Sequence, residues 1–199
     1  MKKLALVTAA LAINLLSLPA YAQGGLVLGK PGYGGTGCPG GTASVSLGGG
    51  GKSLSVSFSR YLAVADGRTG KTLDRKSCGL AIPVNVPAGV SVSILSMTFT
   101  GSNALPAGTR SDIRFESFFT GGHGPVFTKS FSGPLQGGFS VKQSVAVSST
   151  VWSSCGADVI LRTNSSLIAR STPGQKASSS IGSQQVRSAV VYTLQSRSC

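Results

Sequence analysis

Apolar and polar residues alternate along much of the chain, which is the pattern of β-strands with one buried face. The alternation is clear from Ala43 to Leu47 and from Leu54 to Ser59. The glycines at 48–51 separate these two runs, so together they predict a β-hairpin. Gly51-Lys52-Ser53 resembles part of a phosphate-binding loop, but a strand follows where such a loop requires a helix.

The same alternation predicts further strands along the chain. They are Leu80–Val86, Val90–Thr100, Ile113–Thr120, Val126–Phe131, Gly138–Ser148, Val159–Thr163, Ser166–Arg170 and a closing strand marked by Val186, Val190, Tyr192 and Leu194. Pro83 predicts an edge or bulged strand, because proline cannot donate a hydrogen bond to a central ladder. The alternation shifts register near Leu95, which predicts a β-bulge.

Two segments do not show this alternation. Tyr61–Ser77 is polar and positively charged, and Ser171–Ser183 is rich in serine, so the first is predicted as an excursion between strands and the second as a mobile loop. After the N-terminal leader, no window has the period of an amphipathic helix. About nine short strands with Gly, Pro and Ser turns predict an all-β, antiparallel β-sandwich rather than a barrel.

The N-terminus has the features of an export signal. Two lysines precede an apolar run from Leu4 to Leu18, and Ala20-Tyr21-Ala22 is a small-residue cleavage site. Residues 1–22 are therefore predicted to be a cleaved signal peptide, and the mature chain is predicted to be secreted or periplasmic. The alternative is an uncleaved anchor, which the short run disfavours, and no transmembrane segment is expected after cleavage. The lysine-rich start and short signal suggest a bacterial protein.

The mature chain has the size of one domain. Residues 23–37 are rich in glycine and predict a flexible lead-in, and residues 38–199 predict a single β-sandwich domain. All four cysteines lie in the exported part, where an oxidising environment favours two disulfides. None has the C-x-x-C spacing of a zinc or thioredoxin-type site.

The cysteine-bearing motifs together resemble a known family. They are Gly37-Cys38-Pro39, Arg75-Lys76-Ser77-Cys78, Val86-Pro87-Ala88-Gly89, Trp152-Ser153-Ser154-Cys155-Gly156 and the terminal Cys199. Their order and spacing are similar to those of a family of small secreted proteins of fungi and bacteria, catalogued only as a domain of unknown function. The resemblance runs from Cys38 to Cys199. It implies a secreted β-rich fold with two disulfides, but neither an activity nor catalytic residues.

The favoured disulfide pairing is Cys38–Cys78 with Cys155–Cys199. Each bond would close a loop of about forty residues, worth roughly 3–4 kcal/mol in the chain-entropy model. A crossed pattern, such as Cys38–Cys199, stays open. The segment Val151–Gly156 is predicted to be tied to the last strand, where it would fix the two β layers together. Its Trp152 is placed to pack on the disulfide, by analogy with immunoglobulin-type sandwiches.

Few residues could support catalysis. The chain has one histidine, His123, in a glycine-rich loop where an exposed, non-catalytic position is predicted. Asp112 and Glu116 share a strand face with Arg110 and Arg114, which predicts a ladder of ion pairs rather than two catalytic carboxylates. No Gly-x-Ser-x-Gly elbow is present, and the scattered Asp and Glu residues suit no metal. The prediction is therefore a protein that is not an enzyme, with no catalytic residues, metal or cofactor.

Positive charge is the strongest functional signal. The mature chain keeps 16 of the 18 basic residues and all 5 acidic ones, a net charge of +11. Such a charge attracts anionic surfaces, and its densest region supplies five candidate contact residues. These are Arg60, Arg68, Lys71, Arg75 and Lys76. The prediction is a binding or structural module that engages an anionic envelope polymer or an extracellular protein.

Several alternatives stay open beside this prediction. The charge could serve solubility alone. A secreted hydrolase could use Asp112, Glu116 or His123, and an inhibitor or effector of another secreted protein would favour an exposed apolar patch. Specific nucleic-acid binding is not expected, because Tyr61 alone is interleaved with the charges. Asn164-Ser165-Ser166 is a glycosylation sequon that matters only in a eukaryotic host.

Overall fold

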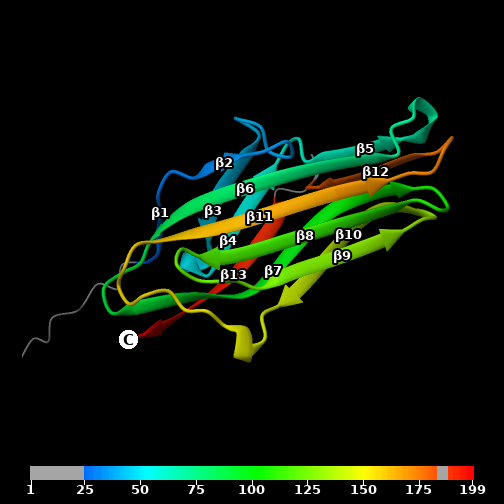
Figure 1. Cartoon of the computed structure of the whole chain (residues 1–199). Coiled ribbons are helices and arrows are strands. Elements are labelled where there is room, and N and C mark those ends of the chain that lie inside the picture. Colours follow the sequence, from blue (N-terminus) through cyan, green and yellow to red (C-terminus); the bar gives the residue numbers. More distant parts are fainter. Residues whose placement is uncertain (1–24, 183–187) are drawn as a thin grey trace, which may run out of the picture.

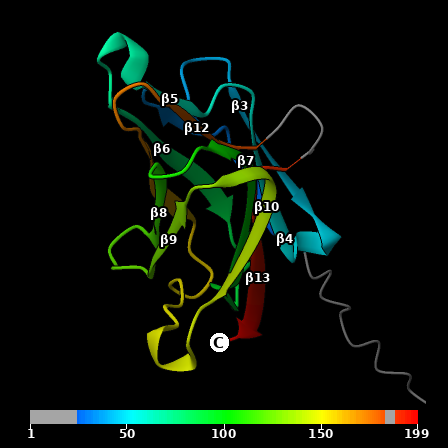
Figure 2. The ribbon, with the colours of Figure 1, turned by 90° about the vertical axis from the view of Figure 1, so that its right-hand side faces the viewer.

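The computed structural model of the protein describes residues 25–182 and 188–199. They form two antiparallel β-sheets that lie against each other (Figures 1 and 2). The cysteines form two disulfides, so the predicted all-β sandwich with two disulfides is confirmed. The signal peptide predicted at residues 1–22 and Val186 of the predicted closing strand lie outside the described residues.

Sheet A is the front layer in Figure 1. Its strands, in spatial order, are β1 (Val27–Leu28), β6 (Leu73–Asn85), β11 (Val159–Arg170), β8 (Arg110–Phe119) and β9 (Val126–Ser132), with β2 (Gly32–Gly34) also paired to β6. Sheet B has the order β3 (Ala43–Gly48), β4 (Ser53–Phe58), β13 (Val190–Ser198), β7 (Val90–Leu105), β12 (Lys176–Ile181) and β5 (Leu62–Asp66), with β10 (Leu135–Ser144) also paired to β7. Three short 3-10 helices occupy turns: η1 (Gly49–Gly51), η2 (Gly67–Thr69) and η3 (Val147–Ser149). The described residues thus contain thirteen strands rather than about nine.

The core lies between the sheets and is built from inward side chains of both. Sheet A contributes Ile82, Phe115 and Leu161, and sheet B contributes Val56 and Phe99, each at most 1% exposed. Burying such a side chain stabilises a fold by about 1.5–3 kcal/mol relative to leaving it exposed. The alternate residues of the same strands point outward, so each sheet presents one outer face.

Two local predictions are confirmed. β3 and β4 form the predicted hairpin, and the glycines of η1 have the positive φ that other residues rarely adopt. The register between β7 and β13 shifts between Thr193 and Leu194, which leaves Leu95 as an extra residue on β7. This is the predicted β-bulge, and it leaves Leu95 45% exposed.

The two segments without clear alternation contain strands. β5 and the start of β6 lie within Tyr61–Ser77, and β12 lies within Ser171–Ser183. The prediction of a mobile loop is wrong, because β12 is paired on both sides, with β7 and with β5. Its buried positions are Ala177, Ser179 and Ile181. Since two of these three are small or polar, burial alternates along β12 while hydrophobicity does not.

The described part of the predicted lead-in, residues 25–37, also belongs to the sheets. β1 and β2 pair with β6, and Leu26, Leu28 and Tyr33 pack against the core. Sheet pairing therefore starts before Cys38, the predicted start of the domain.

Pro83 lies in β6, opposite a gap between β1 and β2. Gly29 N donates to Pro83 O at 3.0 Å, so this side of Pro83 faces the connection between those two short strands. A residue in an antiparallel pair directs its N–H and C=O to the same side, so the N–H that proline lacks would also point there. β11 pairs with the other side of β6 without a register shift. The prediction of an edge or bulged strand is therefore wrong, because the gap accommodates the proline.

The segment Val151–Gly156 is tied to the last strand, as predicted, by the Cys155–Cys199 disulfide. Ser153 N donates to Val92 O at 2.9 Å, so the segment runs beside β7, and Arg197 of β13 lies 4.1 Å from the centre of the Trp152 ring. Both contacts are with sheet B. The segment therefore anchors the start of the crossover to β11 and does not itself fix the two layers together.

Buried hydrogen bonds join the two sheets instead. Tyr192 of β13 shares its hydroxyl with Ser117 at 3.1 Å and with Thr163 at 2.9 Å, both in sheet A. Tyr61, next to β5, makes a 3.0 Å bond with Ser165 of β11. Burial raises the pKa of Tyr61 to about 12, although Ser165 and the charge of Arg75 lower it in part. These phenols stay protonated at neutral pH and act as structural cross-links.

Candidate anion-binding face

Three of the five predicted contact residues are engaged in ion pairs. Arg68 lies 2.7 Å from Asp66, and Lys71 and Lys76 lie 2.7 and 3.6 Å from Asp74. The other two, Arg60 and Arg75, are exposed and make no ion pair with any described residue. The structure thus disperses the predicted set: Arg75 lies on the outer face of sheet A, and the two lysines surround a buried carboxylate. Binding of an anionic surface by these residues stays a prediction.

The two aspartates of this region are held ionised by their neighbours. Hydrogen bonds from Arg68 lower the pKa of Asp66 to about 2. Burial alone would raise the pKa of Asp74, but the bonds from Lys71 and Val64 N and the charge of Lys76 outweigh burial, so this pKa is also lowered. Asp74 belongs to sheet A and Val64 to sheet B, so their 2.9 Å bond is another link between the layers.

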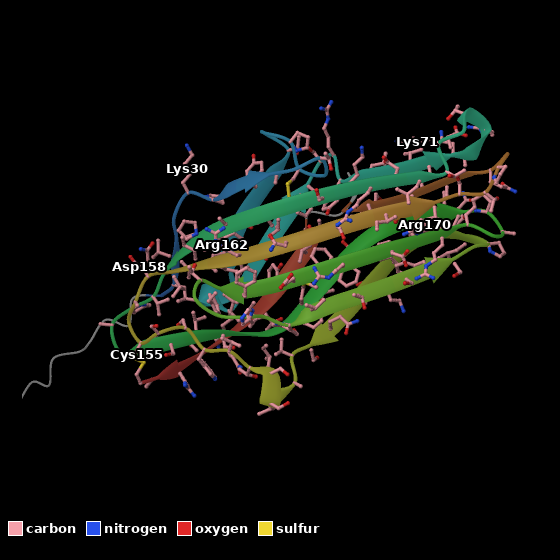
Figure 3. All side chains as sticks on the ribbon, in the orientation of Figure 1. Lys30, Lys71, Cys155, Asp158, Arg162 and Arg170 are labelled. Carbon is pink, nitrogen blue, oxygen red and sulfur yellow. A yellow bond between two sulfur atoms is a disulfide. The ribbon has the colours of Figure 1, made fainter. Side chains whose placement is uncertain are left out.

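The outer face of sheet A carries five exposed arginines on three adjacent strands. β6, β11 and β8 pair so that Ile168 lies between Arg75 and Asp112, and Ser166 lies between Ser77 and Arg114. Outward residues of these strands therefore form rows across the sheet. We call this surface the arginine face; its members are Arg75, Arg110, Arg114, Arg162 and Arg170. Figure 3 shows Arg162 and Arg170 near opposite ends of β11.

Two carboxylates on the arginine face neutralise part of its charge. Arg110 and Arg170 lie 2.6 and 3.5 Å from Asp112, and Arg114 lies 3.2 Å from Glu116. The predicted ladder of ion pairs is confirmed. Burial raises the pKa of Asp112, but hydrogen bonds from Ser130 and Arg110 outweigh it, so the pKa is lowered. A carboxylate held ionised in this way is a poor general acid.

Arg75 and Arg162 are the arginines of this face without a carboxylate partner among the described residues. Between Arg75 and Arg114 the surface is hollowed by about 300 Å³. We call this depression the Gly79 hollow; its lining residues are Arg75, Ser77, Cys78, Gly79, Arg114, Asn164, Ser165 and Ser166. The candidate set from the sequence contained only Arg75 of these, because it was drawn from charge density along the chain. The spacing of four between Arg110 and Arg114 already placed Arg114 on an outward strand face, whereas no charge pattern marked Gly79 or Asn164.

The residues weighed for catalysis are not brought together. His123 lies exposed in the loop between β8 and β9, as predicted, and has no hydrogen bond or ion pair with any described residue. Asp112 and Glu116 are both occupied by arginines. Within residues 25–182 and 188–199, no three His, Cys, Asp or Glu side chains gather closely enough to hold a metal. No helix in the same ranges is long and apolar enough to cross a membrane.

A family model described as "Domain of unknown function (DUF4360)" matches residues 26–199. The chain belongs to the DUF4360 family. A similar protein is an "Uncharacterized secreted protein" of Arthroderma benhamiae, 31% identical over 134 residues. The alignment covers 67% of this chain and 55% of that protein. The resemblance carried by the cysteine motifs is thereby confirmed, and the family match begins before the first cysteine.

Proposed function

We propose that the protein is a secreted, non-catalytic module that binds an acidic polysaccharide through the arginine face. The observation that carries the proposal is the set of five exposed arginines at outward positions of β6, β11 and β8. The two disulfides and the secreted relative support a protein that works outside the cell. The five arginines exceed the two carboxylates on this face, so it has a net positive charge.

An extended polymer suits this face better than a compact partner does. Arg162 and Arg170 are eight positions apart on β11, a span of about 26 Å at roughly 3.3 Å per residue. Exposed ion pairs are individually weak, typically below about 1 kcal/mol, so affinity requires several contacts along one chain. Arginine suits this role because its planar guanidinium binds a carboxylate through two parallel hydrogen bonds.

The opposite face of the molecule supports an oriented interaction. One row across sheet B consists of Ser46, Ser55, Val191, Thr98 and Lys142. Sheet B does carry exposed basic residues, Lys142, Lys176 and Arg197, but they are fewer than the five arginines of the arginine face. The turn that carries Arg68 and Lys71 continues the positive surface, since Figure 3 shows Lys71 and Arg170 at the same end of the molecule.

The test is retention on immobilised polygalacturonate, measured as the salt concentration needed for elution. The variant Arg75→Gln/Arg162→Gln removes two charges that have no carboxylate partner among the described residues, so it leaves no carboxylate exposed. The control Lys52→Gln/Lys142→Gln removes equal charge from two exposed residues away from the arginine face, one in the turn before β4 and one on β10 of sheet B. We expect the arginine variant to bind about tenfold more weakly and the control to bind as the wild type does. Equal losses in both variants, or no retention of the wild type, would refute the proposal.

A further inference from the structure

We propose that the Gly79 hollow is a subsite for one uronate residue of the bound polymer, with the sugar carboxylate held between Arg75 and Arg114. This inference rests on the proposed function and adds the kind of sugar that the face selects. It gives Gly79, Asn164 and their neighbours a role in binding. The proposed function, which rests on the charge of the arginine face, gives them none.

The size of the hollow favours a sugar residue over a bare ion. Its volume of about 300 Å³ is at the lower end of small-molecule sites. Gly79 is one of the lining residues, and because it lacks a side chain it leaves the hollow open. The fold itself does not require glycine at this position. A Cβ on Gly79 would lie 3.8 Å from Asn164 Oδ1 and 3.9 Å from Gly34 O, which are ordinary contacts. Glycine within a strand costs stability, and it often marks a place where another molecule approaches the backbone.

Four polar side chains around the hollow are without a hydrogen-bond partner among the described residues. Arg75, Ser77, Asn164 and Ser166 make no side-chain hydrogen bond with any described residue. Arg114 makes one such bond, from Nη1 to Glu116 at 3.2 Å, and keeps its other N–H groups available. No carboxylate lines the hollow. This combination suits an anionic group beside several hydroxyls: guanidinium forks for a carboxylate, and amide and hydroxyl groups for the sugar ring.

The floor of the hollow is held from beneath. Ser165 Oγ donates to Cys78 O at 3.2 Å, and Tyr61 bonds to the same hydroxyl at 3.0 Å. Cys78 is also joined to Cys38 by a disulfide. β6 and β11 are therefore fixed to each other and to the core under the site, which lowers the entropy lost on binding. No aromatic side chain lines the hollow, so charge and hydrogen bonds, not stacking, select the sugar.

The experiment is calorimetric titration with trigalacturonate, its methyl ester and an equally charged sulfated trisaccharide. The protein is made in a bacterial host, which leaves the sequon at Asn164 without glycan. Gly79→Val fills the hollow with three carbons without changing charge, and Ala81→Val adds two carbons two residues along β6, outside the lining. We expect Gly79→Val to weaken trigalacturonate binding by about tenfold or more, and Ala81→Val to leave it unchanged. The methyl ester should bind at least about tenfold more weakly than the acid.

Other outcomes separate this inference from the proposed function. If polygalacturonate retention depends on Arg75 and Arg162 but Gly79→Val binds trigalacturonate normally, the subsite is wrong and the proposed function stands. If the wild type is not retained on polygalacturonate at all, both fail. Equal affinity for the sulfated trisaccharide or the methyl ester overturns the uronate assignment. If Gly79→Val unfolds at a lower temperature, Asn164→Ala, which keeps the fold contacts and removes one donor, takes its place.

Discussion

At the scale of single residues, the hydroxyl of Tyr192 is the most informative contact between the sheets. The side chain is fully buried and bonds with Ser117 and Thr163 of the opposite sheet. Tyr192→Phe should lower the unfolding free energy by about 1 kcal/mol, because Ser117 and Thr163 can still bond to each other across 3.2 Å. Urea denaturation measures this loss. Tyr33→Phe is the control, since the Tyr33 hydroxyl accepts a single exposed bond from Gly41 N and its loss should cost little.

Contacts between residues of one strand could be predicted from the sequence, whereas contacts between distant strands could not. Arg110, Asp112, Arg114 and Glu116 alternate along one strand, and a period of two places them on one face wherever the strand lies. The ion-pair ladder therefore followed from local spacing. The bonds of Tyr192 join residues 75 and 29 positions apart. Such contacts depend on how the sheets stack. The local sequence does not show which residue an inward Ser or Thr will bond to.

At the scale of elements, the β5–β6 connection depends on ionised aspartates. The folded pKa values of Asp66 and Asp74 are both lowered, so each contributes stability above its ordinary pKa of 3.8 that is lost as the pH falls through the folded value. Stability should therefore decline as the pH drops below about 4, toward about 2 for Asp66.

Replacing one of these aspartates tests that account. Asp74→Asn should cost about 1–2 kcal/mol at pH 7, because two lysines lose a buried counter-charge, and should make the acid decline shallower. Urea denaturation between pH 2 and pH 7 would show both effects. Asp66→Asn is the comparison: because its pair with Arg68 is exposed, this change should cost less than Asp74→Asn at neutral pH. An acid decline that is unchanged in Asp74→Asn would show that other groups set it.

Strands were predictable where apolar residues mark the buried face and not where serine does. β3, β4 and the bulge of β7 follow from alternation in sequences such as Val90–Thr100. β12 was missed because Ser179 occupies an inward position, β2 because two of its three residues are glycine, and β1 because two residues are too few to show alternation. Each of these strands is specified mainly by its neighbours in the sheet, whose positions depend on the fold as a whole.

For the whole molecule, the net charge followed from composition, but the face of the molecule that carries it did not. The net charge of +13 says nothing about which sheet bears it. That depends on the register of β6, β11 and β8, since a shift of one residue would exchange inward and outward side chains. The arginine face could therefore be assembled only after three strands far apart in sequence were paired.

The two disulfides differ in a way that links stability to the proposed site. Cys38 and Cys78 are 0% and 2% exposed, whereas Cys155 and Cys199 are exposed at the surface. Because thiol exchange requires access to the sulfurs, a mild reductant with an alkylating agent should label Cys155 and Cys199 first. Mass spectrometry of the labelled peptides measures the order. Equal labelling of all four cysteines from the start would show that access does not control reduction.

Opening the exposed bond should leave the binding face intact. The Cys155–Cys199 link closes a 44-residue separation and is worth about 4 kcal/mol in the chain-entropy model, less than the stability of most domains. Cys155→Ser/Cys199→Ser should therefore unfold at lower urea yet bind trigalacturonate normally. Cys38→Ser/Cys78→Ser removes the bond beneath the Gly79 hollow, so its binding should weaken even under conditions where the protein remains folded. Equal binding losses in the two variants would mean that the hollow depends on overall stability and not on the support under β6.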